Sequence, residues 1–99
     1  NKQRLTQICL ADLNRIKLNT LVAHLSIRQI NYTIFRPGSL TDDRATGKVQ
    51  TQRPSSKEKM TIHREDVARA LTYAVGKPQL GGKVFELFNG SKSLTDVLN

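Results

Sequence analysis

The sequence is poor in the residues that usually stabilise a small domain, namely cysteines for disulfides or zinc sites and large aromatic residues for a core. Its 99 residues include one cysteine, Cys9, and no tryptophan, which excludes a disulfide within the chain and a cysteine-based zinc site. Cys9 itself is typical of a small buried apolar residue. Aromatic residues make up 5% and hydrophobic residues 37% of the chain, so the core that it can build is modest. This composition favours a part of a larger unit over a free-standing domain.

Long hydrophobic runs are also absent. No stretch approaches the ~20 apolar residues that cross a membrane. The chain does not start with a basic segment followed by an apolar segment and a small-residue cleavage site. We therefore expect a soluble, cytoplasmic protein with no membrane partner.

Negative charge is scarce, since 8 Asp and Glu stand against 16 Lys and Arg and give a formal net charge of +8. An excess of this size suggests nucleic acid as a partner. The basic residues are scattered singly, however, and no aromatic residues alternate with them to form a stacking platform. The pattern favours ordinary solvated side chains and leaves a small basic nucleic-acid-binding domain as the weakest alternative.

The first third of the chain predicts one long helix over 5–29. One apolar face recurs every three or four residues and comprises Leu5, Cys9, Leu13, Ile16, Thr20, Ala23 and Ile27. A second face lies nearly opposite and comprises Leu18, Leu21, Val22 and Leu25. A helix with two apolar faces requires burial on both. We therefore expect the Leu18/Leu21/Leu25 face to pack against a missing N-terminal half or a second chain.

The rest of the chain alternates strands with helices. β-branched and aromatic residues before Pro37 predict a strand over 32–36, which a loop over 37–60 follows. The pattern continues with a helix over 64–75, a strand over 83–88 and a short C-terminal helix over 93–98 that Ser93 caps. This order predicts an α/β fold in which residues 1–99 form a single incomplete segment.

Four segments of the chain carry a resemblance to a known family. They are Tyr32-Thr-Ile-Phe-Arg-Pro-Gly-Ser-Leu40, Thr46-Gly-Lys-Val49, His63-Arg-Glu-Asp-Val-Ala-Arg-Ala-Leu71 and Gly82-Lys-Val-Phe-Glu-Leu-Phe-Asn-Gly90. Through them, the chain from about Lys17 onward resembles the carboxyl-terminal part of atypical short-chain dehydrogenase/reductases, the NAD(P)-binding, NmrA-like and epimerase-like group. The resemblance implies the C-terminal portion of a Rossmann-type, doubly wound parallel sheet.

The Gly-rich turn of that family is missing from this sequence. In the family, amide groups at a helix N-terminus after the first strand hold the dinucleotide pyrophosphate. Gly76, Gly81 and Gly82 have the wrong spacing. The resemblance therefore implies a fragment of an NAD(P)-dependent oxidoreductase-like protein that forms the nicotinamide-side wall and substrate lip and is inactive alone. NAD or NADP would bind to the longer parent. The alternative is an NmrA-like, non-catalytic dinucleotide sensor or interaction protein.

The resemblance also supplies candidate site residues. Lys17 lies near the place of the catalytic lysine in the family's Tyr-x-x-x-Lys pair, but Leu13 occupies the tyrosine position. Without that phenol, Lys17 is either a ribose contact or a solvated lysine. The cofactor-binding candidates follow the 32–36 strand, where the backbone would pass the nicotinamide, and they are Arg36, Pro37, Gly38, Ser39 and Leu40.

Two further patterns have competing explanations. Arg36 could reach a phosphate or a substrate carboxylate, or it could anchor the loop to Asp42 or Asp43. His63-Arg-Glu65 matches the His-x-Glu of zinc deaminases, but the Pro-Cys-x-x-Cys that should accompany it is absent. Glu65 and Asp66 are better explained as negative charges at a helix N-terminus. We predict no metal site.

Overall fold

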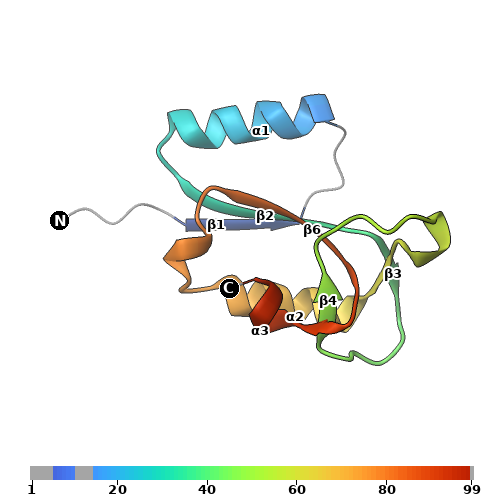
Figure 1. The fold of residues 1–99 in the computed structure, drawn as a ribbon. Helices are drawn as coiled ribbons and strands as arrows, with labels where there is room; N and C mark the ends of the chain where they lie inside the picture. The colour runs from blue at the N-terminus through green and yellow to red at the C-terminus, as the bar shows by residue number, and fades with distance from the viewer. Residues whose placement is uncertain (1–5, 11–14, 99) are drawn as a thin grey trace.

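The computed structural model describes residues 6–10 and 15–98, which form a main sheet of five strands in the order β1-β2-β6-β4-β7 (Figure 1). Strands β1 (Thr6–Leu10), β2 (Asn31–Pro37) and β6 (Lys83–Asn89) run parallel. Strand β4 (Lys48–Gln50) runs antiparallel to both β6 and β7 (Lys92–Ser93). A separate parallel pair joins β3 (Ser39–Thr41) to β5 (Thr61–His63).

Helices cover both faces of the parallel strands. Helix α1 (Arg15–Ile27) lies on one side, and α2 (Arg64–Ala74) and α3 (Leu94–Val97) lie on the other (Figure 1). Two short 3-10 turns, Lys57–Lys59 and Pro78–Leu80, connect the remaining elements. No helix in the described ranges is long and apolar enough to cross a membrane. The predicted α/β class, with parallel strands covered on both faces, is confirmed.

Strand β2 carries buried side chains on both of its faces. Ile34 and Phe35 are both completely buried, although they point to opposite sides of the sheet. On the α1 side, Ile34 packs with Leu18 and Leu25 in a small cluster. On the α2 side, Phe35 belongs to the main core, whose fully buried members also include Val49, Ile62, Leu80 and Leu87. Adjacent apolar residues such as Ile34 and Phe35 are typical of a parallel strand that is covered on both faces.

The predicted helix over 5–29 is wrong at its start. Residues 6–10 form strand β1, which pairs in register with β2 from Thr6 opposite Asn31 to Leu10 opposite Phe35. Of the described residues within 5–29, only 15–27 are helical. Positions 5 and 11–14 of the prediction lie outside the described residues. A short apolar run satisfies helical spacing and strand formation equally well. Hydrogen bonding to β2 decided the outcome.

The orientation of α1 also corrects the expectation of an outside partner. Leu18 and Leu25 are buried within this chain against Ile34, with Leu21 and Val22 packed beside them. The face that was expected to need a missing half or a second chain is therefore the one that covers β2. The opposite face is the exposed one, since Ile16 and Ile27 are 77% and 82% exposed.

Other boundaries shift by smaller amounts. The predicted strands over 32–36 and 83–88 correspond to β2 and β6, and the predicted helix over 64–75 ends one residue earlier as α2. The C-terminal helix over 93–98 shortens to α3. The predicted loop over 37–60 contains β3, β4 and a 3-10 turn. The three residues of β3 are too few for an alternating pattern to be visible in sequence.

Asp66 connects α2 to the segment that precedes β4. Its side chain is completely buried and accepts hydrogen bonds from the backbone N–H groups of Thr46 (3.1 Å) and Gly47 (2.9 Å). Glu65 beside it accepts one from the N–H of Ala45 (3.2 Å). The acidic pair that the sequence suggested was a helix N-terminal charge therefore also fixes the 45–47 turn and, with it, the start of β4.

We expect Asp66→Ala to lower the free energy of unfolding by about 2 to 4 kcal/mol, because two charge-assisted hydrogen bonds are lost and two backbone donors are left unpaired. Urea denaturation followed by circular dichroism measures this loss. Asp42→Ala is the matched control, since the Asp42 side chain is 87% exposed and its ion pair with Arg64 should contribute little. Equal effects of the two substitutions would contradict the role given to Asp66.

Candidate functional site

The site is built where β2 ends. Pro37 closes the strand, and the next two residues turn away from the main sheet to begin β3. The N–H of Gly38 donates to the carbonyl of Leu87 (3.0 Å), and the N–H of Ser39 donates to the carbonyl of Met60 (2.9 Å). These bonds tie the corner to β6 on one side and to the segment before β5 on the other. The corner is thus held at the carboxyl ends of two parallel strands, where open α/β sheets bind ligands.

A pocket of about 280 Å³ opens at this corner. Its walls come from the β2–β3 turn, from β6 and from the loop between β4 and β5. The lining residues are Arg36, Pro37, Gly38, Ser39, Arg53, Met60, Glu86 and Phe88. Four of the five cofactor-binding candidates therefore lie together in one cavity. Leu40 does not line it and is 41% exposed.

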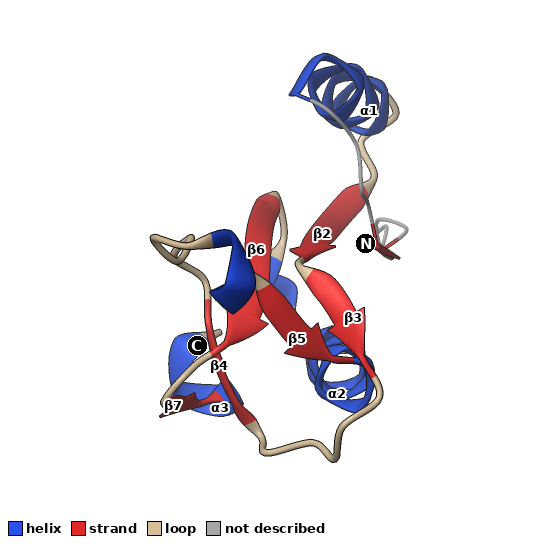
Figure 2. Cartoon of the chain, turned by 90° about the vertical axis from the view of Figure 1, so that its right-hand side faces the viewer, coloured by secondary structure: helices blue, strands red, loops and turns tan. Residues whose placement is uncertain are grey.

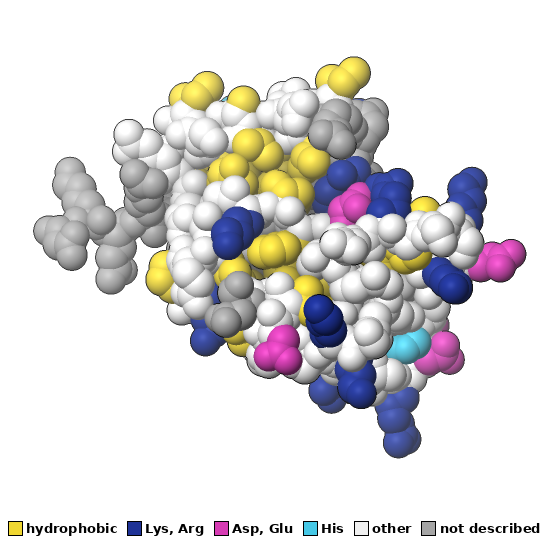
Figure 3. Space-filling model, viewed as in Figure 1, with side chains coloured by type: hydrophobic (Ala, Val, Ile, Leu, Met, Phe, Trp, Pro, Cys, Tyr) yellow, Lys and Arg dark blue, Asp and Glu magenta, His cyan; other side chains and the backbone are white. Residues whose placement is uncertain are grey.

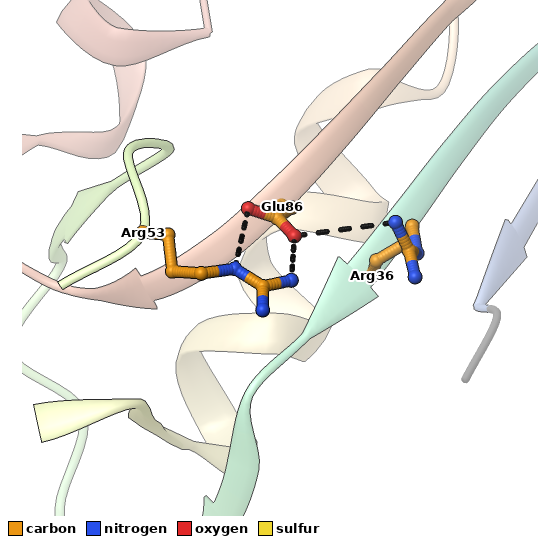
Figure 4. A network of polar contacts seen from close by, with 3 residues as sticks. All are labelled: Arg36, Arg53 and Glu86. Atoms are coloured by element: carbon orange, nitrogen blue, oxygen red, sulfur yellow. Dashed lines mark hydrogen bonds and ion pairs between the residues drawn. The ribbon is translucent and has the colours of Figure 1, made fainter. Parts of the chain in front are cut away.

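Three charged side chains meet beside the pocket (Figure 4). Arg36 on β2 and Glu86 on β6 are direct partners in the sheet register, and Arg36 Nη1 lies 4.0 Å from Glu86 Oε1. Arg53, from the loop after β4, approaches the same carboxylate from the other side. Its Nη2 donates to Glu86 Oε1, and its Nε donates to Glu86 Oε2 at 3.5 Å. One carboxylate thus holds two guanidinium groups together.

The carboxylate of Glu86 stabilises the charged form of Arg53. The hydrogen bond to Glu86 raises the pKa of Arg53 above its ordinary value, with a Coulombic contribution from the same carboxylate. This shift reinforces the protonated state that an arginine already holds at neutral pH. Glu86 thus lies between two positively charged side chains.

A second hollow, of about 630 Å³, lies on the α1 side of the same three residues. Both apolar and polar side chains of α1, β2 and β6 line it, and Arg36, Arg53 and Glu86 are among them. The other lining residues are Leu18, Asn19, Val22 and Val84. Figure 3 shows this face, with hydrophobic side chains exposed below α1 and basic and acidic side chains gathered at one end. The charged group therefore separates two adjoining hollows.

Lys17 lies outside both cavities. It is exposed on α1, next to Leu18, which lines the second hollow. Because α1 connects the parallel strands β1 and β2, its first turn lies at the same edge of the sheet as the Pro37 corner. Lys17 therefore lies at that edge of the sheet but does not line the pocket at the corner.

Two residues of the site, Arg53 and Glu86, were not found from sequence. Glu86 was only one member of the predicted strand over 83–88, and Arg53 lay in the predicted loop over 37–60. The alternation of Val84 and Glu86 could have indicated that both face α1, but their partners depend on the register of β2 against β6. The structure does not pair Arg36 with Asp42 or Asp43, as one sequence-based alternative suggested. Asp42 pairs instead with Arg64 (3.0 Å).

The ring and the backbone N–H of His63 both form hydrogen bonds within the chain. Its Nδ1 lies 2.8 Å from the hydroxyl of Thr41, and its N–H donates to the side-chain oxygen of Asn89 (3.2 Å). Within the part of the chain that the structure describes, no group of three or more His, Cys, Asp or Glu residues is placed to hold a metal ion.

The chain belongs to the NAD(P)H-binding family, whose model matches residues 16–78. This confirms the NAD(P)-binding resemblance and gives NAD or NADP as the family's cofactor. The matched region contains α1 except for Arg15, together with the Pro37 corner and Arg53, but ends before Glu86. No curated protein matches the chain.

Three solved structures are similar to the described fold, each with 25% sequence identity. A protein described as an NAD-dependent epimerase/dehydratase from Bacillus halodurans matches 92% of this chain with a TM-score of 0.71. The oxidoreductase ylbE from Lactococcus lactis also matches 92%, with a TM-score of 0.69. ChuY, an anaerobillin reductase from Escherichia coli O157:H7, matches 86%, with a TM-score of 0.60. This chain covers 49%, 49% and 50% of their respective lengths, so it spans about half of each.

Gly38 is required by packing within the chain. A Cβ atom at this position would lie 2.5 Å from the carbonyl oxygen of Met60 and 2.9 Å from Cδ1 of Phe88. The Met60 carbonyl cannot withdraw easily, because it also accepts the hydrogen bond from Ser39, and the Phe88 side chain is buried. The absence of a side chain at Gly38 therefore allows the two backbones to cross, whether or not a ligand is bound.

We expect Gly38→Ala to destabilise the protein by about 1 to 3 kcal/mol through overpacking. Thermal and urea denaturation measure the effect. Ser39→Ala is the control, because Ser39 is exposed and its side chain makes no comparable contact. A Gly38→Ala protein as stable as its parent would show that the corner can open without cost.

Proposed function

We propose that this chain is part of a cytoplasmic NAD(P)-dependent oxidoreductase-like protein and forms the nicotinamide-side wall and substrate lip of its active site. The observation that carries the proposal is the pocket at Pro37, Gly38 and Ser39. It lies at the carboxyl ends of β2 and β6 in a chain of the NAD(P)H-binding family. The oxidoreductase and reductase among the similar structures support redox chemistry at this position.

Within this proposal, the backbone at Pro37 and Gly38 faces the nicotinamide ring. Pro37 offers no N–H group, and the N–H of Gly38 is already committed to Leu87. The corner therefore presents a surface with few competing donors. Lys17, at the same edge of the sheet, is the candidate for contact with the nicotinamide ribose, and no residue of the chain is assigned as the proton donor.

The pyrophosphate-binding half would join the sheet at β1. Strand β1 pairs with β2 along one edge, and no other described strand pairs with its second edge. Parallel sheets are normally extended and covered on both faces, so an open edge of this kind is a natural place for further parallel strands. We therefore place the missing half against β1 instead of against the Leu18/Leu21/Leu25 face.

The first test concerns the cofactor. Most of the affinity for a dinucleotide comes from its phosphates, so the 99-residue chain alone should bind NAD(P)H negligibly, whereas the complete protein should bind it. Isothermal calorimetry on both proteins measures this difference. A micromolar dissociation constant for the isolated chain would contradict the assignment of the phosphate site to another segment.

The second test concerns Lys17 and the class of function. In the complete protein, Lys17→Ala should weaken NAD(P)H binding by roughly ten- to a hundredfold if the ammonium group donates a charge-assisted hydrogen bond to the ribose. Lys83→Ala is the control, because Lys83 is exposed at the opposite end of β6. Unchanged binding in Lys17→Ala would contradict a ribose contact and favour the alternative that Lys17 is a solvated surface lysine.

Enzymatic turnover of NAD(P)H distinguishes an oxidoreductase from a non-catalytic dinucleotide sensor. Oxidation of NAD(P)H by carbonyl or quinone substrates favours the oxidoreductase. Tight dinucleotide binding without turnover across a broad panel favours the NmrA-like sensor, to which the leucine at position 13 also points.

A further inference from the structure

One wall of the corner pocket is carried by the two-stranded sheet of β3 and β5. Ser39, the first residue of β3, and Met60, which directly precedes β5, both line the pocket. Strand β5 pairs with β3 in a sheet that is separate from the one containing β6. Figure 2 shows β5 between β3 and β6. The shape of the pocket therefore depends on what holds β5 to the end of β6.

Asn89, the last residue of β6, joins the two sheets through its side chain. Its amide oxygen accepts a hydrogen bond from the backbone N–H of His63 (3.2 Å), and its Nδ2 donates to the hydroxyl of Thr61 (3.3 Å). A backbone N–H can only donate, so the bond to His63 fixes which end of the amide faces each partner. One side chain thus contacts both ends of β5.

Strand β3 and the pocket residues follow the position of β5. Thr61 is the register partner of Ser39, and His63 is the register partner of Thr41. At the second pair, the side chains of His63 and Thr41 lie 2.8 Å apart. At the corner, the carbonyl of Met60 accepts the hydrogen bond from the N–H of Ser39. Holding β5 at its two ends therefore also sets where Ser39 and Met60 stand in the pocket.

Apolar packing also holds β5, because Ile62 at its centre is completely buried in the main core. Packing of this kind is not directional, whereas a hydrogen bond requires an aligned donor and acceptor. Without the Asn89 amide, β5 would stay attached through Ile62 but could shift against β6. The N–H of His63 would also lose the acceptor that it has in the structure. Ile62 thus anchors the strand, and Asn89 sets its exact position.

We propose that Asn89 is a positioning residue, whose side-chain amide holds the Ser39 and Met60 wall in the shape that receives the nicotinamide end of the dinucleotide. This proposal rests on the proposed function, because it takes the pocket to be the nicotinamide site. A wall that is already in place does not have to be ordered when the ligand binds. Asn89 therefore affects the nicotinamide end of the cofactor and not the adenosine and phosphate end, which another segment binds.

The first measurement compares two ligands on the complete protein by calorimetry, NAD(P)H and the corresponding ADP-ribose or its 2′-phosphate, which lack the nicotinamide. Asn89→Leu keeps the size of the side chain but removes both hydrogen bonds. It should weaken NAD(P)H binding by about three- to tenfold and leave binding of the ADP-ribose compound unchanged. Asn89→Asp should restore both affinities, because a carboxylate accepts from the N–H of His63 and from the Thr61 hydroxyl, which can turn to donate.

Gln50→Leu is the matched control. The Gln50 side chain donates to the backbone carbonyl of Asn89 (3.0 Å), so its removal costs Asn89 a hydrogen bond but keeps the link to β5. Both affinities should therefore equal those of the parent. Equal weakening of the two ligands in Asn89→Leu would show a general structural effect and overturn the positioning role. Unchanged NAD(P)H binding in Asn89→Leu would overturn it as well.

A second measurement needs no cofactor. Hydrogen exchange of the complete protein, followed by mass spectrometry, should become faster in Asn89→Leu over 38–41 and 60–63 and stay unchanged in α2. Unchanged exchange in the first two segments would contradict the role of Asn89. Failure of the parent to bind either ligand would overturn the proposed function, and the exchange pattern would still decide whether Asn89 positions the wall. If circular dichroism shows that Asn89→Leu is unfolded, Thr61→Val breaks the same link from β5 and should give the same pattern with a smaller amplitude.

Discussion

Strand β2 has to bury both of its faces, and the rest of the structure follows from that requirement. Its neighbouring residues Ile34 and Phe35 point in opposite directions and are both completely buried. One face therefore needs α1 and the other needs α2 with the main core. Parallel pairing with β1 and β6 supplies the backbone hydrogen bonds that a strand buried in this way cannot obtain from water. Strand β2 is thus held by a neighbouring strand along each edge and by packed side chains on each face, up to the residues that begin the site.

The same constraint creates the site at the end of the strand. Once the register of β2 against β6 is set by Ile34 beside Val84, the next pair on that face must be Arg36 beside Glu86. The carboxylate then lies where Arg53 can reach it from the loop after β4. At the same level, Gly38 allows the chain to pass close to Met60 and start β3. Packing in the sheet therefore positions both the polar group and the backbone corner.

Much of the fold could be predicted from sequence because its strongest signals are local. Pro37 ends a run of β-branched and aromatic residues, so the end of β2 and the candidates Arg36 to Ser39 were accessible to sequence reasoning. The helix at α2 was equally clear, since an apolar face and an acidic first turn coincide. Strand β1 was not, because its three apolar residues, Ile8, Cys9 and Leu10, fit helical spacing as well as strand formation. Arg53 and Glu86 were missed because their meeting depends on contacts between distant segments.

By itself, the sequence determined the α/β class, the position of the Pro37 corner and the likeness to NAD(P)-binding proteins, since each depends on residues that are neighbours along the chain. Only the tertiary structure decided which face of α1 is buried, which strands pair and which charges meet. Periodicity shows that a helix has two apolar faces, but the choice between them depends on what the sheet offers, and here Ile34 receives Leu18 and Leu25. Likewise, the attraction between Glu86 and two arginines exists only after three separate segments have been brought together by the burial of apolar surface.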